Sequence, residues 1–135
     1  MRKDFMFTSQ SVTEGHPDKL CDQISDAIVD SFLQQDPFSR IITECAVSTG
    51  VVFIAARYAS DAKIDFADVA RKIILQSGYE QDSFNAEDAT ILTSLGQLAP
   101  YDHPPTDEHG MSDEEIDQVT VKNQANAFGF ACNQT

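Results

Sequence analysis

Positively charged residues are scarce in this 135-residue sequence. It holds 9 Lys and Arg against 22 Asp and Glu, a formal net charge of −13. No Lys or Arg stands between Lys72 and Lys122, where half of the acidic residues lie. Binding nucleic acid regardless of sequence needs a surplus of cations facing the phosphates, and an anionic membrane surface makes the same demand. The deficit disfavours both partners, and a polyanionic ligand would need metal ions or a partner to supply positive charge.

Cysteines and long apolar runs are also few. Cys21, Cys45 and Cys132 are odd in number and show no CxxC spacing, which disfavours a disulfide framework or a zinc knuckle. Residues 1–11 lack the run of about 7–15 apolar residues that is typical of a signal peptide. No stretch approaches the roughly 20 apolar residues of a membrane span. We therefore expect a soluble, cytoplasmic protein with reduced thiols.

Apolar residues make up 41% of the chain, which is enough for a packed core. Their helical spacing after Pro17 predicts a helix over residues 17–35. Two segments rich in β-branched residues, 40–49 and 51–59, meet at Gly50 and predict a β-hairpin. The second is so apolar that both of its faces are expected to be covered.

A second helix is predicted from a cap at Asp65 to a terminating glycine, Gly78, followed by a strand over residues 89–95. A short strand is also expected within residues 5–11. Together these elements predict an α+β fold, a two-layer sandwich in which a mixed or antiparallel sheet carries helices on one face.

The last third of the chain has a different pattern. Residues 97–110 are rich in proline and acidic side chains and lack periodicity, which predicts a long mobile loop. Ser112 and Glu115 form a capping box before a short helix that we expect to end near residue 120. Residues 128–132 resemble the beginning of a strand without a partner, which suggests a fragment.

Residues 14–19, EGHPDK, place acidic, imidazole and ammonium groups at the start of the first predicted helix. Backbone N–H groups at a helix start favour anions. Asp18 offers the hard oxygen that Mg²⁺ takes when it keeps its waters and bridges to a phosphate. His16 can donate a proton or a hydrogen bond to a leaving oxygen. The alternative is a plain helix start, with Ser11 and Glu14 as a capping box and His16 as a surface side chain.

Glu44 is the acidic residue of the first predicted strand, and its carboxylate needs a cation nearby. If Thr49 and Gly50 form the turn, Glu44 lies opposite Ala55 and diagonal to Arg57, within reach of an ion pair. Two interpretations therefore stay open for Glu44: an ion pair with Arg57, or a ligand role.

Residues 7–19, FTSQSVTEGHPDK, and 22–27, DQISDA, closely resemble the N-terminal signature of S-adenosylmethionine synthetase (methionine adenosyltransferase). Thr43-Glu44, Gly78-Tyr79 and the final FGFACNQT follow the family in order. The likeness covers essentially the whole chain, which corresponds to the first part of the family's chain.

The resemblance implies a transferase reaction in which the sulfur of methionine attacks C5′ of ATP. Tripolyphosphate leaves and is hydrolysed to pyrophosphate and phosphate. By matched position, His16 would be catalytic and would bind the ATP phosphates at the breaking bond. Asp18 would bind Mg²⁺ and Glu44 would bind the activating K⁺. Family members are dimers or dimers of dimers, with the site between subunits.

The resemblance also implies a domain organisation, because the family has three related α+β domains. Residues 1–97 would form the N-terminal domain and residues 98–111 the mobile acidic loop that gates the site. Residues 112–135 would be a linker helix and the incomplete start of the central domain.

Three positions depart from the family pattern: Arg57 replaces a glutamate that contacts methionine, Leu98 a loop glutamine, and Asn123 an aspartate near the adenosine. The methionine-binding residues are therefore left unassigned. We expect the 135-residue piece alone to be inactive, because the family's later lysines, arginines and glycine-rich phosphate loop are missing. The alternative is a stand-alone, non-catalytic domain that acts as a truncated or regulatory partner of a full-length synthetase.

Overall fold

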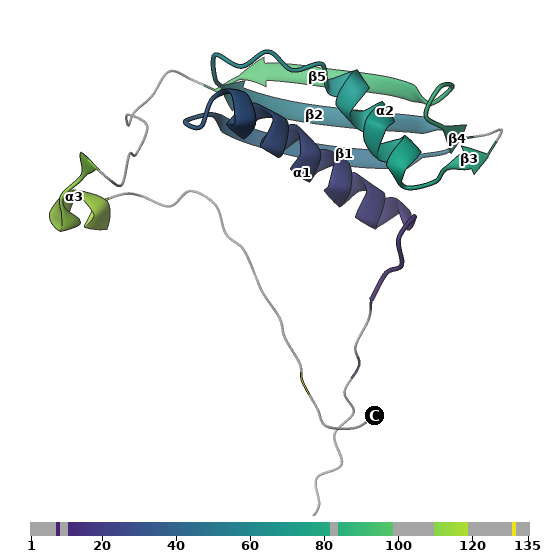
Figure 1. Cartoon of the computed structure of the whole chain (residues 1–135), viewed down its shortest axis with the longest axis horizontal. Coiled ribbons are helices and arrows are strands. Elements are labelled where there is room, and N and C mark those ends of the chain that lie inside the picture. The colour runs from purple at the N-terminus through teal and green to yellow at the C-terminus, as the bar shows by residue number, and fades with distance from the viewer. Residues whose placement is uncertain (1–7, 9–10, 82–83, 99–109, 119–130, 132–135) are drawn as a thin grey trace, which may run out of the picture. The chain divides into compact units, whose positions relative to one another are not determined.

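The computed structural model describes residues 8, 11–81, 84–98, 110–118 and 131. They fall into two units, residues 1–102 and residues 103–135. The first unit is an α+β structure, as the sequence predicts (Figure 1). In chain order its elements are α1 (Pro17–Gln35), β1 (Arg40–Ser48), β2 (Val51–Ala59), α2 (Phe66–Gln76), β3 (Glu80–Gln81), β4 (Phe84–Asn85) and β5 (Thr90–Gln97).

The main sheet is mixed and has the strand order β1-β2-β5. β1 and β2 run antiparallel and meet at the predicted turn, where φ is 44° at Thr49 and 80° at Gly50. A turn with two left-handed residues follows the right-handed twist of the flanking strands, and glycine adopts that conformation without steric cost. β5 runs parallel to β2, with α2 as the crossover between them. The predicted hairpin and mixed sheet are both confirmed.

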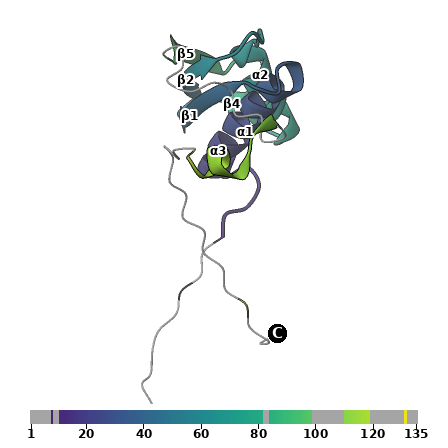
Figure 2. The same cartoon turned by 90° about the vertical axis from the view of Figure 1, so that its left-hand side faces the viewer.

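Helices α1 and α2 lie on one face of this sheet and make a two-layer structure (Figures 1 and 2). The buried side of α1 repeats every four residues, as its apolar spacing predicts, and packs on β1 and on α2. The core consists of apolar side chains from both helices and from β2, with Phe84 and Ala89 at its margin. Its main members are Leu20, Ile24, Ile28, Phe32, Val52, Ile54, Ala56, Phe66, Ala70 and Ile74.

Among the described residues of this first unit, no helix lies on the opposite face of the sheet. Ile42, Phe53 and Leu92 are 38%, 43% and 50% exposed there. The expectation that both faces of β2 are covered is therefore wrong within this unit. Its residues alternate between buried and more exposed positions, and the apolar residues Val51, Phe53 and Ala55 on the more exposed side gave β2 its continuous apolar pattern. We call Ile42, Phe53 and Leu92, with the residues between them on this side, the open face.

The helix ends are fixed by specific side chains. α1 begins at Pro17 with His16 as its N-cap, so the capping box predicted as an alternative at Ser11 and Glu14 does not start this helix. The Asp65 carboxylate caps α2, as predicted, by accepting a hydrogen bond from the backbone N–H of Asp68 at 3.0 Å. Beyond the end of α2, Gly78 has a φ of 75°, the left-handed conformation for which glycine is favoured.

Two details of the first unit differ from the sequence predictions. β5 runs from Thr90 to Gln97 rather than over residues 89–95, because its pairing with β2 extends to Tyr58. Gln97, the first residue of the predicted loop, therefore belongs to β5. The small hairpin of β3 and β4 was not predicted, because strands of two residues are too short to show any periodicity.

In the second unit the described helix is α3 (Asp113–Asp117), and its capping box between Ser112 and Glu115 is confirmed. Most of residues 5–11 and 128–132, where strands are predicted, and most of the loop at 97–110 lie outside the described residues. Among the helices that the structure describes, none has the length and apolar character needed to cross a membrane.

Candidate functional site

The start of α1 holds His16 in a defined orientation. His16 has extended backbone geometry, with φ −65° and ψ 135°, as expected for a residue before proline. Its Nδ1 atom accepts a hydrogen bond from the backbone N–H of Asp18 at 3.1 Å. A ring nitrogen that accepts must carry a lone pair, so the proton of the neutral ring resides on Nε2. His16 therefore presents a hydrogen-bond donor away from the helix.

Asp18 lies beside His16 in the first turn of α1. One carboxylate oxygen of Asp18 is 3.9 Å from His16 Nδ1, and the Asp18 side chain is 86% exposed. A carboxylate in the first turn is favoured by the positive end of the helix dipole. The imidazole and the carboxylate thus face solvent together at one helix end, where backbone N–H groups also favour an anion.

Tyr79 anchors the chain that leads into this helix. Its hydroxyl donates a hydrogen bond to the carbonyl oxygen of Gly15, the residue before His16. The Tyr79 ring packs edge-on against Phe84 in β4, with ring centroids 4.9 Å apart. Gly15 itself has a φ of 83°, a conformation that other residues adopt only with strain. The end of α2 and the small hairpin therefore hold the histidine segment in place.

Sequence reasoning did not identify this role of Tyr79. The sequence signal was the Gly78-Tyr79 pair, which matched the family pattern without indicating a contact. The contact joins residues 64 positions apart, and local periodicity carries no information on such a pair.

Glu44 lies away from the start of α1, where His16 and Asp18 are. In β1 the residues directed toward the helices, Ile41, Cys45 and Val47, alternate with exposed ones, and Glu44 is exposed on the open face. His16 and Asp18 belong to α1, which covers the other face. Within this unit the two predicted metal ligands therefore lie on separate surfaces.

The predicted register around Glu44 is confirmed, since it pairs with Ala55 while Arg57 pairs with Ile42. Among the described residues, however, no ion pair within 4.0 Å joins Glu44 to Arg57. The stem of Arg57 lies beside Gly96, where an added Cβ atom would be 3.4 Å from Arg57 Cγ. The ion-pair interpretation is thus not realised in this structure, and Glu44 keeps its carboxylate available.

The carboxylates of Asp18 and Glu44 can each provide one ligand to a metal ion. Mg²⁺ commonly binds proteins through one or two carboxylates and completes its shell with waters and phosphate oxygens, which suits an exposed Asp18. K⁺ also prefers oxygen ligands, such as the Glu44 carboxylate. Within the described part of the chain, no three His, Cys, Asp or Glu residues gather into a metal-binding group. Further ligands would have to come from substrate or from other parts of the protein.

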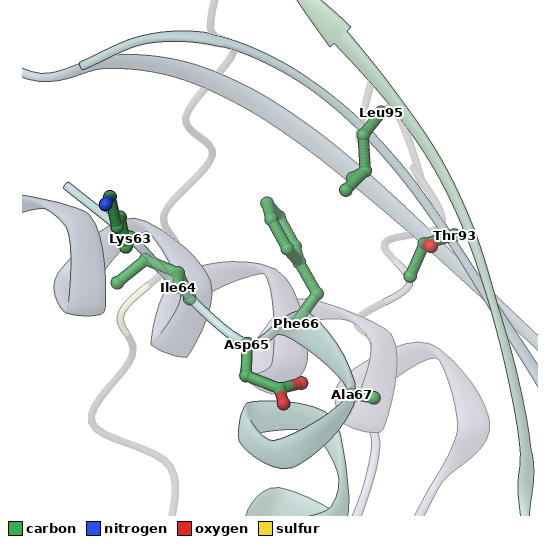
Figure 3. Close-up of a pocket in the computed structure, with 7 residues that line it drawn as sticks. All are labelled: Lys63, Ile64, Asp65, Phe66, Ala67, Thr93 and Leu95. Atoms are coloured by element: carbon green, nitrogen blue, oxygen red, sulfur yellow. The ribbon is translucent and has the colours of Figure 1, made fainter. Parts of the chain in front are cut away.

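Two cavities lie outside this helix start. One, of about 470 Å³, opens between the beginning of α2 and β5 and is shown in Figure 3. Its acidic group, Asp65, already caps α2, and Phe66 and Leu95 give it apolar walls. A second, of about 320 Å³, lies between α1 and α2 and reaches Glu14. Neither cavity is lined by His16 or Asp18.

Comparison with known families gives a match over most of the chain. Residues 4–100 match the model of the N-terminal domain of S-adenosylmethionine synthetase. That range contains His16, Asp18, Glu44 and Tyr79.

Individual relatives give the same result. S-adenosylmethionine synthases of Gloeothece citriformis and Crocosphaera subtropica are 41% and 42% identical over 142 aligned positions, covering 100% of this chain and 34% of each relative. The synthase of Prochlorococcus marinus is 41% identical over 135 positions, covering 97% of this chain and 33% of its own. The chain thus spans about a third of the length of the curated relatives it matches.

Proposed function

Since the chain belongs to the S-adenosylmethionine synthetase family, we propose that it is the N-terminal part of a methionine adenosyltransferase. The whole enzyme joins the sulfur of methionine to C5′ of ATP and releases tripolyphosphate, which is hydrolysed to pyrophosphate and phosphate. Its substrates are ATP and methionine, and its place is the cytoplasm.

His16 is the catalytic residue of this proposal, and one observation carries the assignment. The hydrogen bond from the Asp18 backbone to His16 Nδ1 leaves Nε2 as a donor. That donor binds the oxygen that departs from C5′ and stabilises the negative charge on the leaving triphosphate. The positive end of α1 favours the same anion.

Asp18 and Glu44 are the metal ligands of the proposal. Asp18 binds Mg²⁺ and Glu44 binds K⁺, each through an exposed carboxylate. When bound, these ions supply positive charge that neutralises the triphosphate. The chain itself has a net charge of −13 and offers little positive charge of its own. No residue is assigned to methionine, because Arg57 stands where a methionine contact is expected from the family pattern.

Residues 1–97 form the N-terminal domain in this proposal, residues 98–111 gate the site, and residues 112–135 begin the connection to a central domain. The isolated chain is inactive, because the remaining phosphate-binding groups belong to the rest of the enzyme. Formation of S-adenosylmethionine by the isolated 135 residues would contradict this expectation.

Self-association covers the open face. Its exposed Phe53 and Leu92 lie side by side in the parallel register, and Ile42 lies further along β1 on the same face, opposite Arg57. A second copy of the protein is the proposed partner, which makes the enzyme a dimer or a dimer of dimers. Burying these side chains in such an interface would remove apolar area from water.

Turnover of ATP and methionine by the full-length protein tests the catalytic assignment. The variant His16→Asn should lower kcat by at least about 100-fold, the usual scale for losing one transition-state donor. Asp18→Asn should also lower kcat, because it removes a Mg²⁺ ligand. Asp26→Asn, an exposed aspartate on the same helix, is the matched control and should keep normal turnover. Equal, small effects at all three positions would overturn the assignment. If the natural chain ends at Thr135, the regulatory-partner alternative replaces the enzyme proposal.

A further inference from the structure

A side chain from α2 holds the turn between β4 and β5. Arg71, in the middle of α2, donates hydrogen bonds from Nη1 to the carbonyl oxygens of Ala86 at 2.5 Å and of Glu87 at 2.9 Å. Two N–H groups of the same turn are bound within it, because the Asn85 side-chain oxygen accepts from Glu87 at 2.9 Å and from Asp88 at 2.8 Å. The turn therefore satisfies these donors itself, whereas its two carbonyl groups take their donor from α2.

Arg71 binds this turn and is not used for an ion pair. Among the residues that the structure describes, no carboxylate lies within 4.0 Å of its guanidinium group. The next residue of the helix, Lys72, does form an ion pair, with Asp68 at 2.7 Å, and both of those side chains are exposed. The half-buried Arg71 offers several donors in fixed directions, which suits two neighbouring carbonyl groups and which a positive charge alone would not provide.

The contact closes residues 71–87 into a loop that contains Tyr79. Within this loop, β3 and β4 pair through two residues each, and so small a hairpin is marginally stable without further support. Phe84 in β4 directly precedes Asn85, the residue that starts the turn. Arg71 therefore fixes the end of the strand whose aromatic ring packs edge-on against Tyr79, with ring centroids 4.9 Å apart.

Tyr79 connects this restraint to the histidine segment. Its hydroxyl donates a hydrogen bond to the carbonyl oxygen of Gly15, the residue before His16. A shift of the Phe84 ring would move the Tyr79 ring with it, because the two rings pack edge to face. The contacts thus run from Arg71 through Phe84 and Tyr79 to the start of α1.

We propose that Arg71 is a positioning residue that keeps the His16 ring in the orientation needed for the reaction. The inference rests on the proposed function, in which His16 Nε2 binds the departing oxygen. A catalytic group that is slightly displaced loses much of its effect, even when the change that displaces it lies far from the reacting atoms. Arg71 is not assigned to bind substrate, and it acts through the small hairpin and Tyr79.

The ring nitrogens of His16 give a test that needs no enzyme activity. In the folded 135-residue chain, ¹H–¹⁵N spectra report the state of each histidine ring, and the signals lost in His16→Asn identify those of His16. Arg71→Met removes the donors and should move the Nδ1 shift of His16 toward that of a free imidazole. Arg71→Lys keeps the charge without the planar group, should move it less in the same direction, and replaces Arg71→Met if that variant does not fold.

Lys72→Met is the matched control for this measurement. It removes the neighbouring positive charge of α2 and the ion pair with Asp68, but it leaves the turn between β4 and β5 untouched. The His16 shifts should therefore equal those of the parent. Equal displacement of the shifts by Lys72→Met would mean that any lost charge on α2 has the same effect, and it would overturn the role of Arg71.

Turnover by the full-length enzyme tests the same coupling. Arg71→Met should lower kcat by about threefold or more, while the KM values for ATP and methionine stay unchanged. Because Arg71 acts through Tyr79, the double variant with Tyr79→Phe should be no slower than Tyr79→Phe alone. A residue that only stabilises the fold would lower Tm, and its effect on kcat would multiply with that of Tyr79→Phe.

The positioning role and the proposed function fail on different results. His16 shifts that stay at the parent value in the folded Arg71 variants, or kcat effects of Arg71→Met and Tyr79→Phe that multiply, would overturn the positioning role. A full-length protein without turnover would overturn the proposed function, and the His16 shifts of the 135-residue chain would still decide whether Arg71 orients His16.

Discussion

The Tyr79 hydroxyl donates a hydrogen bond to the carbonyl oxygen of Gly15, one residue before His16. This contact ties the end of α2 to the turn that precedes α1. The orientation of the catalytic candidate therefore depends on packing between two helices and on Phe84 in the small hairpin, as well as on the local geometry of the histidine segment.

Removing that hydroxyl should affect turnover more than stability. Tyr79→Phe keeps the ring contact with Phe84 but loses one hydrogen bond, which typically contributes about 1 kcal/mol to stability. In the full-length enzyme we expect kcat to fall by roughly tenfold, equivalent to about 1.4 kcal/mol of transition-state stabilisation, with little change in the KM for methionine. Tyr58→Phe is the matched control, because the Tyr58 ring packs on Phe32 and its hydroxyl has no hydrogen bond among the described residues. A purely structural role would lower Tm and leave kcat unchanged.

Asp36 should make the stability of the domain depend on pH. Its carboxylate accepts hydrogen bonds from the Ser60 hydroxyl at 2.8 Å and from the Phe38 backbone at 3.0 Å. These bonds, that of Ser60 first, hold the pKa of Asp36 below its ordinary value of 3.8. Because the folded pKa is the lower one, the stabilisation is present above the unfolded pKa and is lost as pH falls through the folded pKa.

Asp36→Asn should therefore lower the Tm at neutral pH, and the difference from the parent should shrink as the pH falls below 3.8. Thermal unfolding followed by circular dichroism over a pH series measures this. Asp61→Asn removes an exposed carboxylate in the same segment and should leave the Tm unchanged. A Tm difference that is constant with pH would contradict the explanation.

The hydrophobic core between the helices and the sheet should contribute most of the free energy of unfolding. Ile28 is fully buried in the core, and Ile28→Ala should cost about 2–5 kcal/mol of unfolding free energy because it leaves a cavity. Leu33 is on the same helix but is 41% exposed, and Leu33→Ala should cost less than about 1 kcal/mol. Urea denaturation of both variants compares them, and similar costs at the two positions would mean that α1 does not pack as described.

Self-association should depend on the open face. Phe53→Asp places a carboxylate on the exposed side of β2 and should shift the full-length protein toward monomers in sedimentation velocity. Leu75→Asp adds the same charge at a position on α2 that is 65% exposed, away from the sheet, and should leave the assembly intact. Dissociation by Leu75→Asp alone would assign the interface to the helices instead.

In the proposed enzyme, Arg57 should affect the KM for methionine. The residue is exposed on the same face as Glu44, beside Gly96, and departs from the family pattern. If the departure alters methionine recognition, Arg57→Glu should change the KM for methionine severalfold while the KM for ATP stays the same. Steady-state kinetics, with methionine and ATP varied in turn, measures the two KM values separately. A fall in kcat with both KM values unchanged would contradict a role in methionine recognition.

Much of the fold could be predicted because local patterns determine it. The four-residue repeat of buried side chains defined α1, and the positive-φ turn at Gly50 fixed the register that sets Glu44 opposite Ala55. The His16–Asp18 arrangement was also local, because proline forces the preceding residue into extended geometry.

The remaining features depend on distant contacts. The Tyr79 anchor joins the segment after α2 to the turn before α1, and β3 and β4 are too short for their own sequences to define them. The open face could not be recognised because an apolar strand looks the same whether a helix, another domain or another subunit covers its second face. The separation of Glu44 from His16 likewise follows from the arrangement of α1 on the sheet.

The parallel pairing of β5 with β2 has a consequence for the order of folding during synthesis. The β1–β2 hairpin closes through a two-residue turn, and α1 precedes it directly in the chain, so these elements can assemble as soon as they leave the ribosome. β5 pairs only after the chain has returned through α2, which makes it the strand with the largest loop-closure cost. Until β5 arrives, one edge of β2 stays unpaired, and the nascent chain passes through a stage in which that edge can pair with other polypeptides.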